Sequence, residues 1–394
     1  MATRVLQLGG GVWMKQSITK IKELGYEVFC VDANPDAPAF QIADGFKAVN
    51  ISDVSGVGEY ADEIDADVVV PLNDLGVLPS IMANQKRGLN VGAPENVKYY
   101  TDKSEMRKRW AKAGVAQPRF LVCDNIDGIE EAVNTIGYPC IVKPCSMWGS
   151  RGVSKVNQPE DIPFAKTFAA GNSREGNYIV EQCMTGTEVS VEGLFNNGNA
   201  HVLAIADKEL QQHDNYRVTT QINYTAALDE TILCEIKTLV AQAGKAMGFI
   251  SGALHAECMV TADGVKMIEM AGRPGGGHIF GVIVEAVSGI SMPQAYTEIL
   301  LGNSTRVEPR FQHGACYKFF NAPTGLFMGV DGIEQARKMH GVLDIGFTMK
   351  AGTQVGFMDH GANRPGFIVT QGMNRNDAIS AANNAQASLK FSVQ

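Results

Sequence analysis

Apolar runs of strand length alternate with amphipathic segments over the first quarter of the chain. Residues 5–8, 27–31 and 68–70 are apolar runs, and residues 17–24 have the spacing of an amphipathic helix that stops at a glycine. The order strand, helix, strand predicts a parallel sheet covered by helices. We therefore expect residues 1–95 to form a domain of the α/β class.

The pattern changes near residue 96. Residues 101–114 predict a helix with a capping start and a glycine end, and residues 230–248 predict an amphipathic helix. Residues 210–224 are polar without a clear period, so they predict a long loop of the kind that often forms lids or binds substrate. From residue 306 to the end, glycine-punctuated strands and a closing alanine-rich helix predict a small α+β domain.

The most specific local pattern is a pair of glutamates on two neighbouring apolar arms. Between the arms, Ala262-Asp263-Gly264 has the composition of a three-residue hairpin loop with its glycine in the left-handed conformation. Such a loop pairs Thr261 with Val265 and therefore places Glu257 directly opposite Glu269. Their Cβ atoms would lie about 5 Å apart on one face of the hairpin.

Two carboxylates this close repel each other unless a cation lies between them. Arg273 follows Glu269 by four residues and stands beside a glycine run. Hard oxygen ligands near an arginine suggest Mg²⁺ holding a polyphosphate. The alternative is that both glutamates lie on the solvated face of a surface hairpin.

A lysine on a short strand is the second candidate for phosphate binding. Ile141 and Lys143 share one face of this strand, and a glycine-containing turn leads from it to another strand at residues 153–156. Strand–loop–strand is not the order of a Walker motif, but backbone amides of such a loop can form an anion site. The alternative is an ordinary hairpin with an exposed lysine.

A connector between two strands is the third candidate segment. Glu181 ends one strand and Glu188 begins the next. The backbone of such a connector can bind the edge of an adenine, and a carboxylate can accept hydrogen bonds from ribose hydroxyls.

The glycines near the N-terminus have a different explanation. Gly9-Gly10-Gly11 followed by Asp32 superficially resembles a dinucleotide-binding fingerprint. The spacing is not G-x-G-x-x-G, because position 14 is Met14. We therefore interpret these glycines as a tight strand-to-helix turn.

Composition narrows the class of protein. The chain has 394 residues, a net charge of −8 and no stripe of lysine and arginine, which argues against nucleic-acid binding. Polar residues interrupt every apolar run well short of a membrane span. The first residues have the pattern of a strand, so we expect no signal peptide. The eight cysteines form no Cys-x-x-Cys pair. They predict reduced, mostly buried thiols in a cytoplasmic protein.

Taken together, these segments resemble the ATP-grasp superfamily over nearly the whole chain. The stretches Gly252-Ala-Leu-His-Ala-Glu257 and Ile268-Glu-Met-Ala-Gly-Arg273, with the glycine-rich C-terminal region, are most similar to carboxylate–amine ligases of the L-amino acid ligase type. The resemblance implies a mixed α/β and α+β ATP-grasp fold. It has a Rossmann-like N-terminal domain (1–95), an ATP-grasp domain (96–305) with a mobile lid at about 116–186, and a small C-terminal α+β domain (306–394).

The resemblance also implies a set of ATP-binding residues. Lys103 and Lys143 would bind the α- and β-phosphates, with Lys143 also near the adenine. The others are Ser146, Gly149, Ser150 and Gly152 in the loop over the phosphates, Glu181, Gln182, Cys183 and Met184 around the adenine, Glu188 at the ribose and Lys208 near the phosphates.

The same resemblance assigns the metal and the transferred phosphate. Glu257 and Glu269 would bind one or two Mg²⁺ ions, which Mn²⁺ can replace, and Arg273 would hold the transferred phosphate. Many relatives carry asparagine where this chain has Ala271, so a second metal site would be weaker or completed by water or substrate. His255 lies opposite Ala271 in the expected register. Imidazole suits Mg²⁺ poorly, so a structural or substrate role is expected for it.

The implied reaction is ATP-dependent amide formation from a small-molecule carboxylate and an amine, through an acyl phosphate. Cys145 is expected to be a packing residue rather than a nucleophile, and a homodimer is compatible with the resemblance. Alternatives are a carboxylase-type enzyme that activates bicarbonate, a nucleotide-binding regulatory protein and a nicotinamide-dependent oxidoreductase. The candidates for substrate contact are His213, Tyr216, Arg217, His255, Gly276 and His278.

Overall fold

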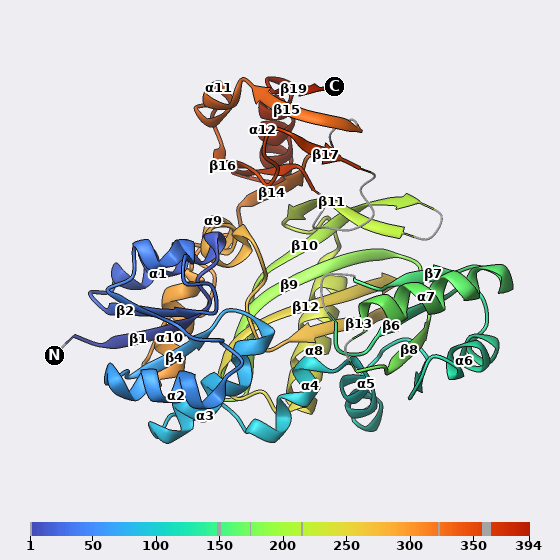
Figure 1. Cartoon of the computed structure of the whole chain (residues 1–394), viewed down its shortest axis with the longest axis horizontal. Helices are drawn as coiled ribbons and strands as arrows, with labels where there is room; N and C mark the ends of the chain where they lie inside the picture. The colour runs from blue at the N-terminus through green and yellow to red at the C-terminus, as the bar shows by residue number, and fades with distance from the viewer. Residues whose placement is uncertain (1, 148–150, 174, 214–215, 322–323, 357–363) are drawn as a thin grey trace.

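The computed structural model describes the chain except residues 1, 148–150, 174, 214–215, 322–323 and 357–363, and it does not describe the side chains of residues 212, 213, 216 and 217. Figure 1 shows the N-terminal elements on the left, the elements of the lid on the right and the C-terminal elements above, around a large central sheet. The N-terminal part and the lid each have their own sheet, and the C-terminal part contributes strands to the central sheet.

The N-terminal part is built on a four-stranded parallel sheet with the order β3-β2-β1-β4. Its apolar runs are buried because helices cover the sheet, and the expected parallel α/β pattern is observed. The strands are β1 (Arg4–Leu8), β2 (Glu27–Asp32), β3 (Gly45–Ala48) and β4 (Val68–Pro71), and the helices are α1 (Lys15–Lys22), α2 (Val54–Glu63) and α3 (Val77–Lys86), with short helices η1 (Val12–Met14), η2 (Pro38–Gln41), η3 (Asp74–Gly76) and η4 (Pro94–Asn96).

The glycine turn after β1 is held by the end of β2. The amide of Gly10 donates to Asp32 Oδ2 at 2.8 Å, and the amide of Asn34 donates to Asp32 Oδ1 at 2.9 Å. The turn leads directly into η1 and α1. Asp32 therefore stabilises the turn itself. This agrees with the interpretation of the glycine run as a strand-to-helix turn.

The lid contains a second four-stranded sheet, in the order β5-β8-β6-β7, whose neighbouring strands pair antiparallel. Apolar residues from its strands and two helices form a separate hydrophobic cluster. The elements are β5 (Phe120–Cys123), α6 (Gly128–Ile136), β6 (Cys140–Pro144), β7 (Ser154–Val156), η5 (Pro159–Asp161), α7 (Ile162–Asn172) and β8 (Tyr178–Gln182).

The central sheet has eight strands in the order β13-β12-β9-β10-β11-β14-β18-β16. Neighbouring strands pair antiparallel throughout. The strands are β9 (Thr187–Asn196), β10 (Asn199–His213), β11 (Tyr216–Tyr224), β12 (Gly252–Thr261), β13 (Gly264–Ala271), β14 (Gly314–Phe319), β16 (Val342–Phe347) and β18 (Gly366–Gly372), and the helices around it are α4 (Lys98–Thr101), α5 (Lys103–Lys112), α8 (Glu230–Met247), the π-helix η6 (Ile279–Ile283), α9 (Val284–Ser288) and α10 (Met292–Leu301).

The prediction of a long loop at residues 210–224 is wrong. This segment forms the end of β10 and all of β11, paired from Ala206↔Tyr224 onward. Its polar character hid the strand because Gln221 and Asn223 are buried and bonded to each other at 2.8 Å. Both also donate to Glu209 Oε1, at 3.0 and 2.8 Å. Polar residues thus occupy a buried sheet face that pattern analysis expects to be apolar.

The C-terminal elements do not form a separate sheet alone. β14, β16 and β18 extend the central sheet, while β15 (Gly325–Asp331), β17 (Thr353–Val355) and β19 (Lys390–Val393) form a small sheet with the order β17-β15-β19. The helices are α11 (Ile333–Arg337) and α12 (Arg375–Ala387). The alanine-rich helix α12 is present, but strand β19 rather than the helix ends the chain.

Among the described residues, no single helix is long and apolar enough to cross a membrane. A bent pair, Ile279–Ser288 with Met292–Leu301, meets the requirement by length and composition alone.

Candidate active site

One cavity of about 770 Å³ is lined by residues from all parts of the molecule. Asp74 comes from the N-terminal part, Lys143 from the lid, Glu257 from the central sheet and Arg364 from the C-terminal part. A cavity of this size can hold a nucleotide together with a small substrate.

The two glutamates of the hairpin lie directly opposite each other, as predicted. Glu257 on β12 pairs with Glu269 on β13. The expected loop was one residue too long, because Thr261 pairs with Gly264 instead of Val265. A register shift between Glu257 and Cys258 compensates for this difference, so the glutamate pairing is unchanged. The predicted left-handed glycine is present, since Gly264 has φ +103°.

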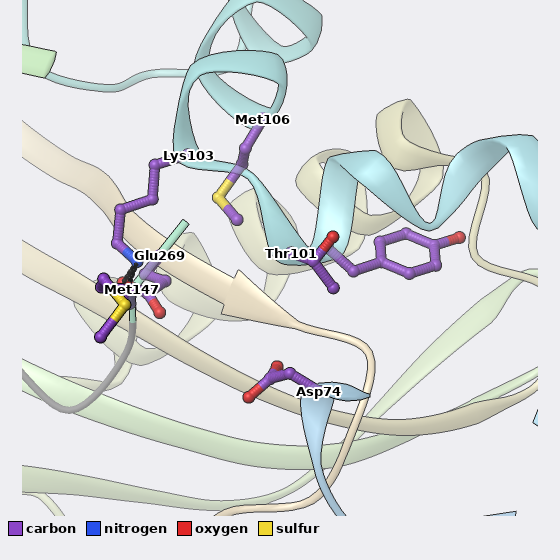
Figure 2. Close-up of a pocket in the computed structure, with 7 residues that line it drawn as sticks. Asp74, Thr101, Lys103, Met106, Met147 and Glu269 are labelled. Atoms are coloured by element: carbon purple, nitrogen blue, oxygen red, sulfur yellow. Dashed lines mark hydrogen bonds and ion pairs between the residues drawn. The ribbon is translucent and has the colours of Figure 1, made fainter. Parts of the chain in front are cut away.

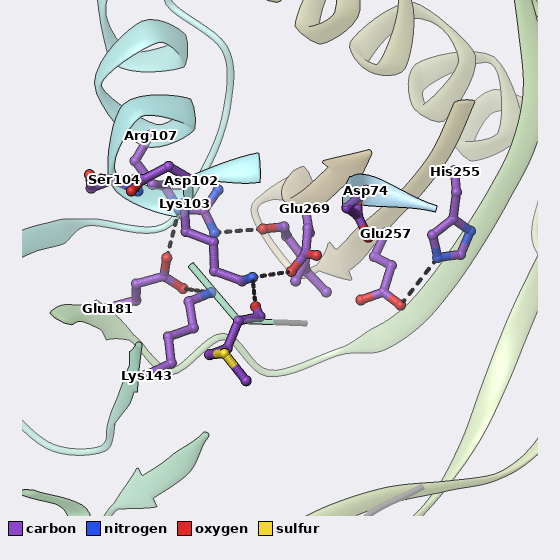
Figure 3. A network of polar contacts seen from close by, with 12 residues as sticks. Asp74, Asp102, Lys103, Ser104, Arg107, Lys143, Glu181, His255, Glu257 and Glu269 are labelled. Atoms are coloured by element: carbon purple, nitrogen blue, oxygen red, sulfur yellow. Dashed lines mark hydrogen bonds and ion pairs between the residues drawn. The ribbon is translucent and has the colours of Figure 1, made fainter. Parts of the chain in front are cut away.

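Each glutamate carboxylate has a lysine partner of its own, and both carboxylates line the cavity. Lys103 Nζ lies 3.3 Å from Glu269 Oε2, and Lys208 Nζ contacts Glu257 Oε1. Burial on its own would raise the pKa of Glu257, but Lys208 and His255 hold it far below its ordinary value. Figure 3 shows the two carboxylates between Lys103 on one side and His255 on the other. The surface-hairpin alternative does not describe this arrangement.

The donor set suits a hard divalent cation that shares its ligands with a substrate. Mg²⁺ is commonly bound by one or two carboxylates and completed by phosphate oxygens and water. Glu257 and Glu269 supply two such carboxylates at the cavity wall. In the described part of the chain, no group of three or more His, Cys, Asp and Glu residues is arranged as a self-sufficient metal site. A cation held here would therefore need oxygen ligands from a bound molecule.

Lys103 is positioned by the cap of helix α5. Asp102 Oδ1 accepts hydrogen bonds from the amides of Ser104 at 2.7 Å and Glu105 at 3.0 Å, which fixes the first turn. The amide of Lys103 donates to the carbonyl of Cys145 at 3.0 Å, and its Nζ donates to the carbonyl of Met147. Figure 2 shows this lysine and Glu269 beside a small side pocket of about 10 Å³. Hydrogen bonds from Lys103 therefore connect the start of α5 to the residues that follow β6 in the lid.

A buried triad of charges links α5 to the lid. Glu181 Oε1 accepts from Arg107 Nε at 2.7 Å, and Glu181 Oε2 lies 2.8 Å from Lys143 Nζ. Burial on its own would raise the pKa of Glu181, but the two cations lower it to about 2. Burial lowers the pKa of Lys143, and the positive charge of Arg107 lowers it further against the opposing effect of Glu181. Two cations on one anion leave a net positive charge in the triad, to which a bound anion is attracted.

The connector after β8 lines the cavity as expected. Gln182, Cys183, Met184 and Glu188 all contribute to its wall. Lys208 Nζ lies 2.9 Å from Glu188 Oε1, so this lysine bridges Glu188 and Glu257. Gly186 has φ +148°, and a Cβ there would come within 1.9 Å of the Val260 carbonyl. The connector can therefore approach β12 only with glycine at this position.

Arg273 also lines the cavity and is held from the N-terminal part. Its Nε donates to Asp74 Oδ2 at 3.1 Å, and its Nη1 donates to the Pro274 carbonyl at 2.9 Å. Burial disfavours the guanidinium, but the Asp74 carboxylate raises the pKa of Arg273 above its ordinary value. This cation is thus oriented beside the paired glutamates.

Comparisons with known proteins agree with this arrangement. Residues 136–281 match the model of the ATP-grasp domain. This chain contains an ATP-grasp domain. Residues 318–394 match the L-amino acid ligase C-terminal domain 2. The ATP-grasp fold and the relationship to ligases of the L-amino acid ligase type, both expected from the sequence, are confirmed.

Individual relatives cover most of the chain. It is 26% identical over 314 residues to the formate-dependent phosphoribosylglycinamide formyltransferase of Aliivibrio fischeri, covering 78% of this chain and 79% of that one. The crystal structure of L-amino acid ligase from Bacillus licheniformis is similar with a TM-score of 0.84 at 20% identity, covering 100% and 99%. That of phosphoribosylglycinamide synthetase from Anaerococcus prevotii has a TM-score of 0.78 at 17% identity, covering 100% of both chains. At these identities, the two structures establish the fold alone.

His255 of the ATP-grasp domain is bonded to a buried carboxylate. Its Nδ1 lies 2.7 Å from Oε1 of Glu192, the cross-strand neighbour on β9, and its Nε2 lies 3.7 Å from Glu257 Oε1. Burial would lower the pKa of His255, but Glu192 raises it to about 9. The His255 ring thus lies between two carboxylates, one of which is the predicted metal ligand Glu257, and its structural or substrate role stays a prediction.

The other residues predicted to contact substrate or phosphate differ in their position relative to the cavity. Gly276 lines the cavity. His278 is only 1% exposed, lies 2.6 Å from Asp344 and packs against Trp13, so it has a packing position. Gly149, Ser150 and the side chains of His213, Tyr216 and Arg217 lie outside the described residues.

Two residues of the phosphate-loop prediction are described but do not line the cavity. Ser146 is half-buried, and Gly152 has φ +72° and leaves no room for a Cβ beside Pro144. Burial raises the pKa of Cys145 to about 12, as expected for a packing residue rather than a nucleophile.

Sequence reasoning missed three charged residues of the site. Arg107 belongs to a helix rich in cations, Asp74 lies in the N-terminal part, and Glu192 lies on β9. Their common property is that each pairs with a predicted site residue more than sixty positions away. No local signal identifies such long-range partners.

Proposed function

We propose that the protein is an ATP-dependent carboxylate–amine ligase that forms an amide or peptide bond through an acyl phosphate and releases ADP and phosphate. The observation that carries this proposal is the pairing of Glu257 with Glu269 at a cavity wall, with Lys103, Lys208 and Arg273 around them. The ATP-grasp and L-amino acid ligase domain matches support the same reaction class.

The nucleotide would lie between the lid and the central sheet. Lys103, Lys143 and Lys208 supply the positive charge for its phosphates, and the connector 182–184 supplies the backbone edge for its adenine. Glu257 and Glu269 would hold Mg²⁺, which neutralises charge on the phosphates during transfer when it is bound. The charge left over in the Arg107–Glu181–Lys143 triad favours an anion at this end of the cavity.

Two displacements account for the chemistry. A carboxylate oxygen of the acid attacks the γ-phosphorus of ATP, the bond to the β-phosphate oxygen breaks, and ADP leaves. The nitrogen of the amine then attacks the acyl carbon, phosphate leaves, and the nitrogen gives up a proton to solvent. Arg273, oriented by Asp74, would stabilise charge on the transferred phosphate in both steps.

In the bicarbonate-activating alternative, ATP phosphorylates bicarbonate instead of the carboxylate of an organic acid. The match of residues 318–394 to an L-amino acid ligase domain favours the amide-forming reaction. Small-molecule substrates follow from either reaction. Cytoplasmic location and a homodimer stay predictions, and sedimentation velocity would test the second.

Nucleotide product analysis tests the proposed function. Purified protein is incubated with ATP, Mg²⁺ and either pooled L-amino acids or bicarbonate. ADP with orthophosphate that depends on amino acids is the expected result. ADP driven by bicarbonate would assign the carboxylase reaction, and AMP with pyrophosphate would rule out an acyl phosphate.

A further inference from the structure

Arg364 lines the part of the cavity formed by the C-terminal residues, and not all of its donors have a hydrogen-bond partner among the described residues. Its Nη2 donates to the Thr219 carbonyl at 2.7 Å, and the guanidinium carbon lies 3.7 Å from the ring centroid of Phe319. Its Nε is buried and has no hydrogen-bond partner in the described part of the chain. Burial lowers the pKa of Arg364 to about 10, which reflects a charge removed from water without a neutralising carboxylate.

Four other cations that line the cavity are different, because each of them has a carboxylate partner. The ion pairs are Lys103 with Glu269, Lys143 with Glu181, Lys208 with Glu188 and Glu257, and Arg273 with Asp74. No carboxylate of the described residues lies within ion-pair distance of Arg364. A guanidinium with one stacked face and a donor that lacks a partner in the described part of the chain is suited to bind a planar carboxylate.

An aromatic wall joins Arg364 to the reaction centre. The rings of Tyr317 and Phe319 are 4.5 Å apart, those of Tyr317 and Phe367 are 5.7 Å apart, and all three residues line the cavity. A Cβ on Gly277 would come within 2.6 Å of the Tyr317 hydroxyl, so this wall begins at the glycine run after Arg273. A substrate that extends from the glycine run toward Arg364 therefore passes an apolar surface and ends at a cation.

We propose that Arg364 binds the carboxylate of the amine substrate, an inference that rests on the proposed ligase function. The amine substrate is therefore an α-amino acid with an apolar side chain. A phosphorylated amine fits less well, since a phosphate dianion carries two negative charges and Arg364 supplies one positive charge. One guanidinium beside three aromatic rings matches one carboxylate and an apolar body.

The test compares matched amines on matched variants. The amines are L-leucine, L-leucinamide and hydroxylamine, and the proteins are the unchanged chain, Arg364→Gln, Arg364→Lys and the control Arg310→Gln, an exposed arginine outside the cavity wall. The acid is the proteinogenic L-amino acid that gives most hydroxamate with the unchanged chain. Hydroxylamine traps the activated acid without a carboxylate of its own, so it reports the first step alone.

The expected result is a change in selectivity between the two amines, without a loss of carboxylate activation. The unchanged chain should use L-leucine with a kcat/KM at least about tenfold above that of L-leucinamide, and Arg364→Gln should reduce this ratio to about one. Hydroxamate formation should stay within about twofold in every variant, and Arg364→Lys should retain part of the ratio. The intrinsic difference in amine reactivity cancels when the ratios of two variants are compared.

Three outcomes overturn this inference. An unchanged ratio in Arg364→Gln would show that the guanidinium does not bind the carboxylate. A parallel loss of hydroxamate would place Arg364 on the acid side or in the fold. A phosphorylated amine preferred over L-leucine and dependent on Arg364 would assign the group to phosphate. Absence of hydroxamate with the unchanged chain would instead reject the proposed ligase function.

Discussion

At the scale of single residues, the site consists of opposite charges brought together from distant parts of the chain. Glu269 bonds to Lys103, and Glu181 bonds to both Arg107 and Lys143. Glu181 and Lys143 also line the cavity, but the three side chains of the triad are almost fully buried, whereas Lys103 and Glu269 are more exposed. Substitutions in the two groups should therefore affect different properties, turnover in one and stability in the other.

Removing the charge of Glu269 should stop turnover without unfolding the protein. In Glu269→Gln the side chain keeps its shape but is a weak ligand for Mg²⁺, so ADP release should fall by at least about 100-fold. Lys103 keeps its bond to the Met147 carbonyl, which limits the structural effect. ADP release with saturating substrates and thermal unfolding are measured together, with Glu308→Gln, an exposed carboxylate, as control. Near-normal turnover by Glu269→Gln would contradict the metal assignment.

Removing the charge of Glu181 should instead destabilise the fold. Glu181→Gln leaves Arg107 and Lys143 without a buried counter-charge, which costs about 3–5 kcal/mol. The pKa of Glu181 is about 2, below its ordinary value of 4.5. Its stabilising effect is therefore fully present above about pH 4.5 and is lost as the pH falls toward 2.

Urea unfolding checks this prediction from about pH 7 down to about pH 3. The gap between the unchanged chain and Glu181→Gln should be largest near neutrality and should narrow below about pH 4.5. Glu230→Gln, on an exposed helix start, serves as the control. A gap independent of pH would mean that the substitution acts through packing and not through charge.

At the scale of elements, the hairpin that follows β9 shows how polar residues can build a buried sheet face. Asn223 accepts from Gln221 Nε2 at 2.8 Å and donates to Glu209 Oε1 at 2.8 Å. Truncation in Asn223→Ala leaves the Gln221 amide short of a partner and should cost about 1–3 kcal/mol. Urea unfolding gives the energy, and hydrogen exchange of β10 and β11 should show the loss of protection there.

The matched control is Asn199→Ala, because Asn199 is an exposed asparagine at the start of β10, where that strand pairs with β9 and not with β11. Its stability should change by less than about 0.5 kcal/mol. Equal effects of the two substitutions would mean that the buried amide network contributes nothing specific to the hairpin.

The same elements show what the sequence can predict. The strands and helices with clear periodicity, such as β1, β2 and α8, were found, and the pairing of Glu257 with Glu269 was right although the loop was too long. β11 was missed because its buried positions are polar. The long-range partners Arg107 and Asp74 were missed because no local pattern predicts which distant charge reaches a site.

At the scale of the whole molecule, the central sheet crosses the predicted domain boundary at residue 306. β14 pairs with β11 in register from Gln221↔Lys318 to Tyr224↔Ala315. On α12, Arg375 binds Asp207 through Nη1–Oδ1 at 2.5 Å and Nη2–Oδ2 at 2.6 Å. The lid, by contrast, has its own sheet and hydrophobic cluster. The C-terminal part is therefore expected to fold only together with the central sheet.

Truncation of the chain tests this dependence. A chain of residues 1–305 loses β14, β16 and β18 and leaves β11 as an unpaired edge beside the buried Asn223 and Tyr224. An exposed long edge of this kind promotes aggregation, so the truncated chain should be insoluble or should lack a cooperative unfolding transition. The control ends at residue 389 and loses β19, which pairs only with β15 in the small sheet; it should remain folded, with lower stability. A soluble, monomeric and cooperatively unfolding 1–305 chain would show that residue 306 begins an independent domain, and that the shared sheet is not needed to form the rest of the site.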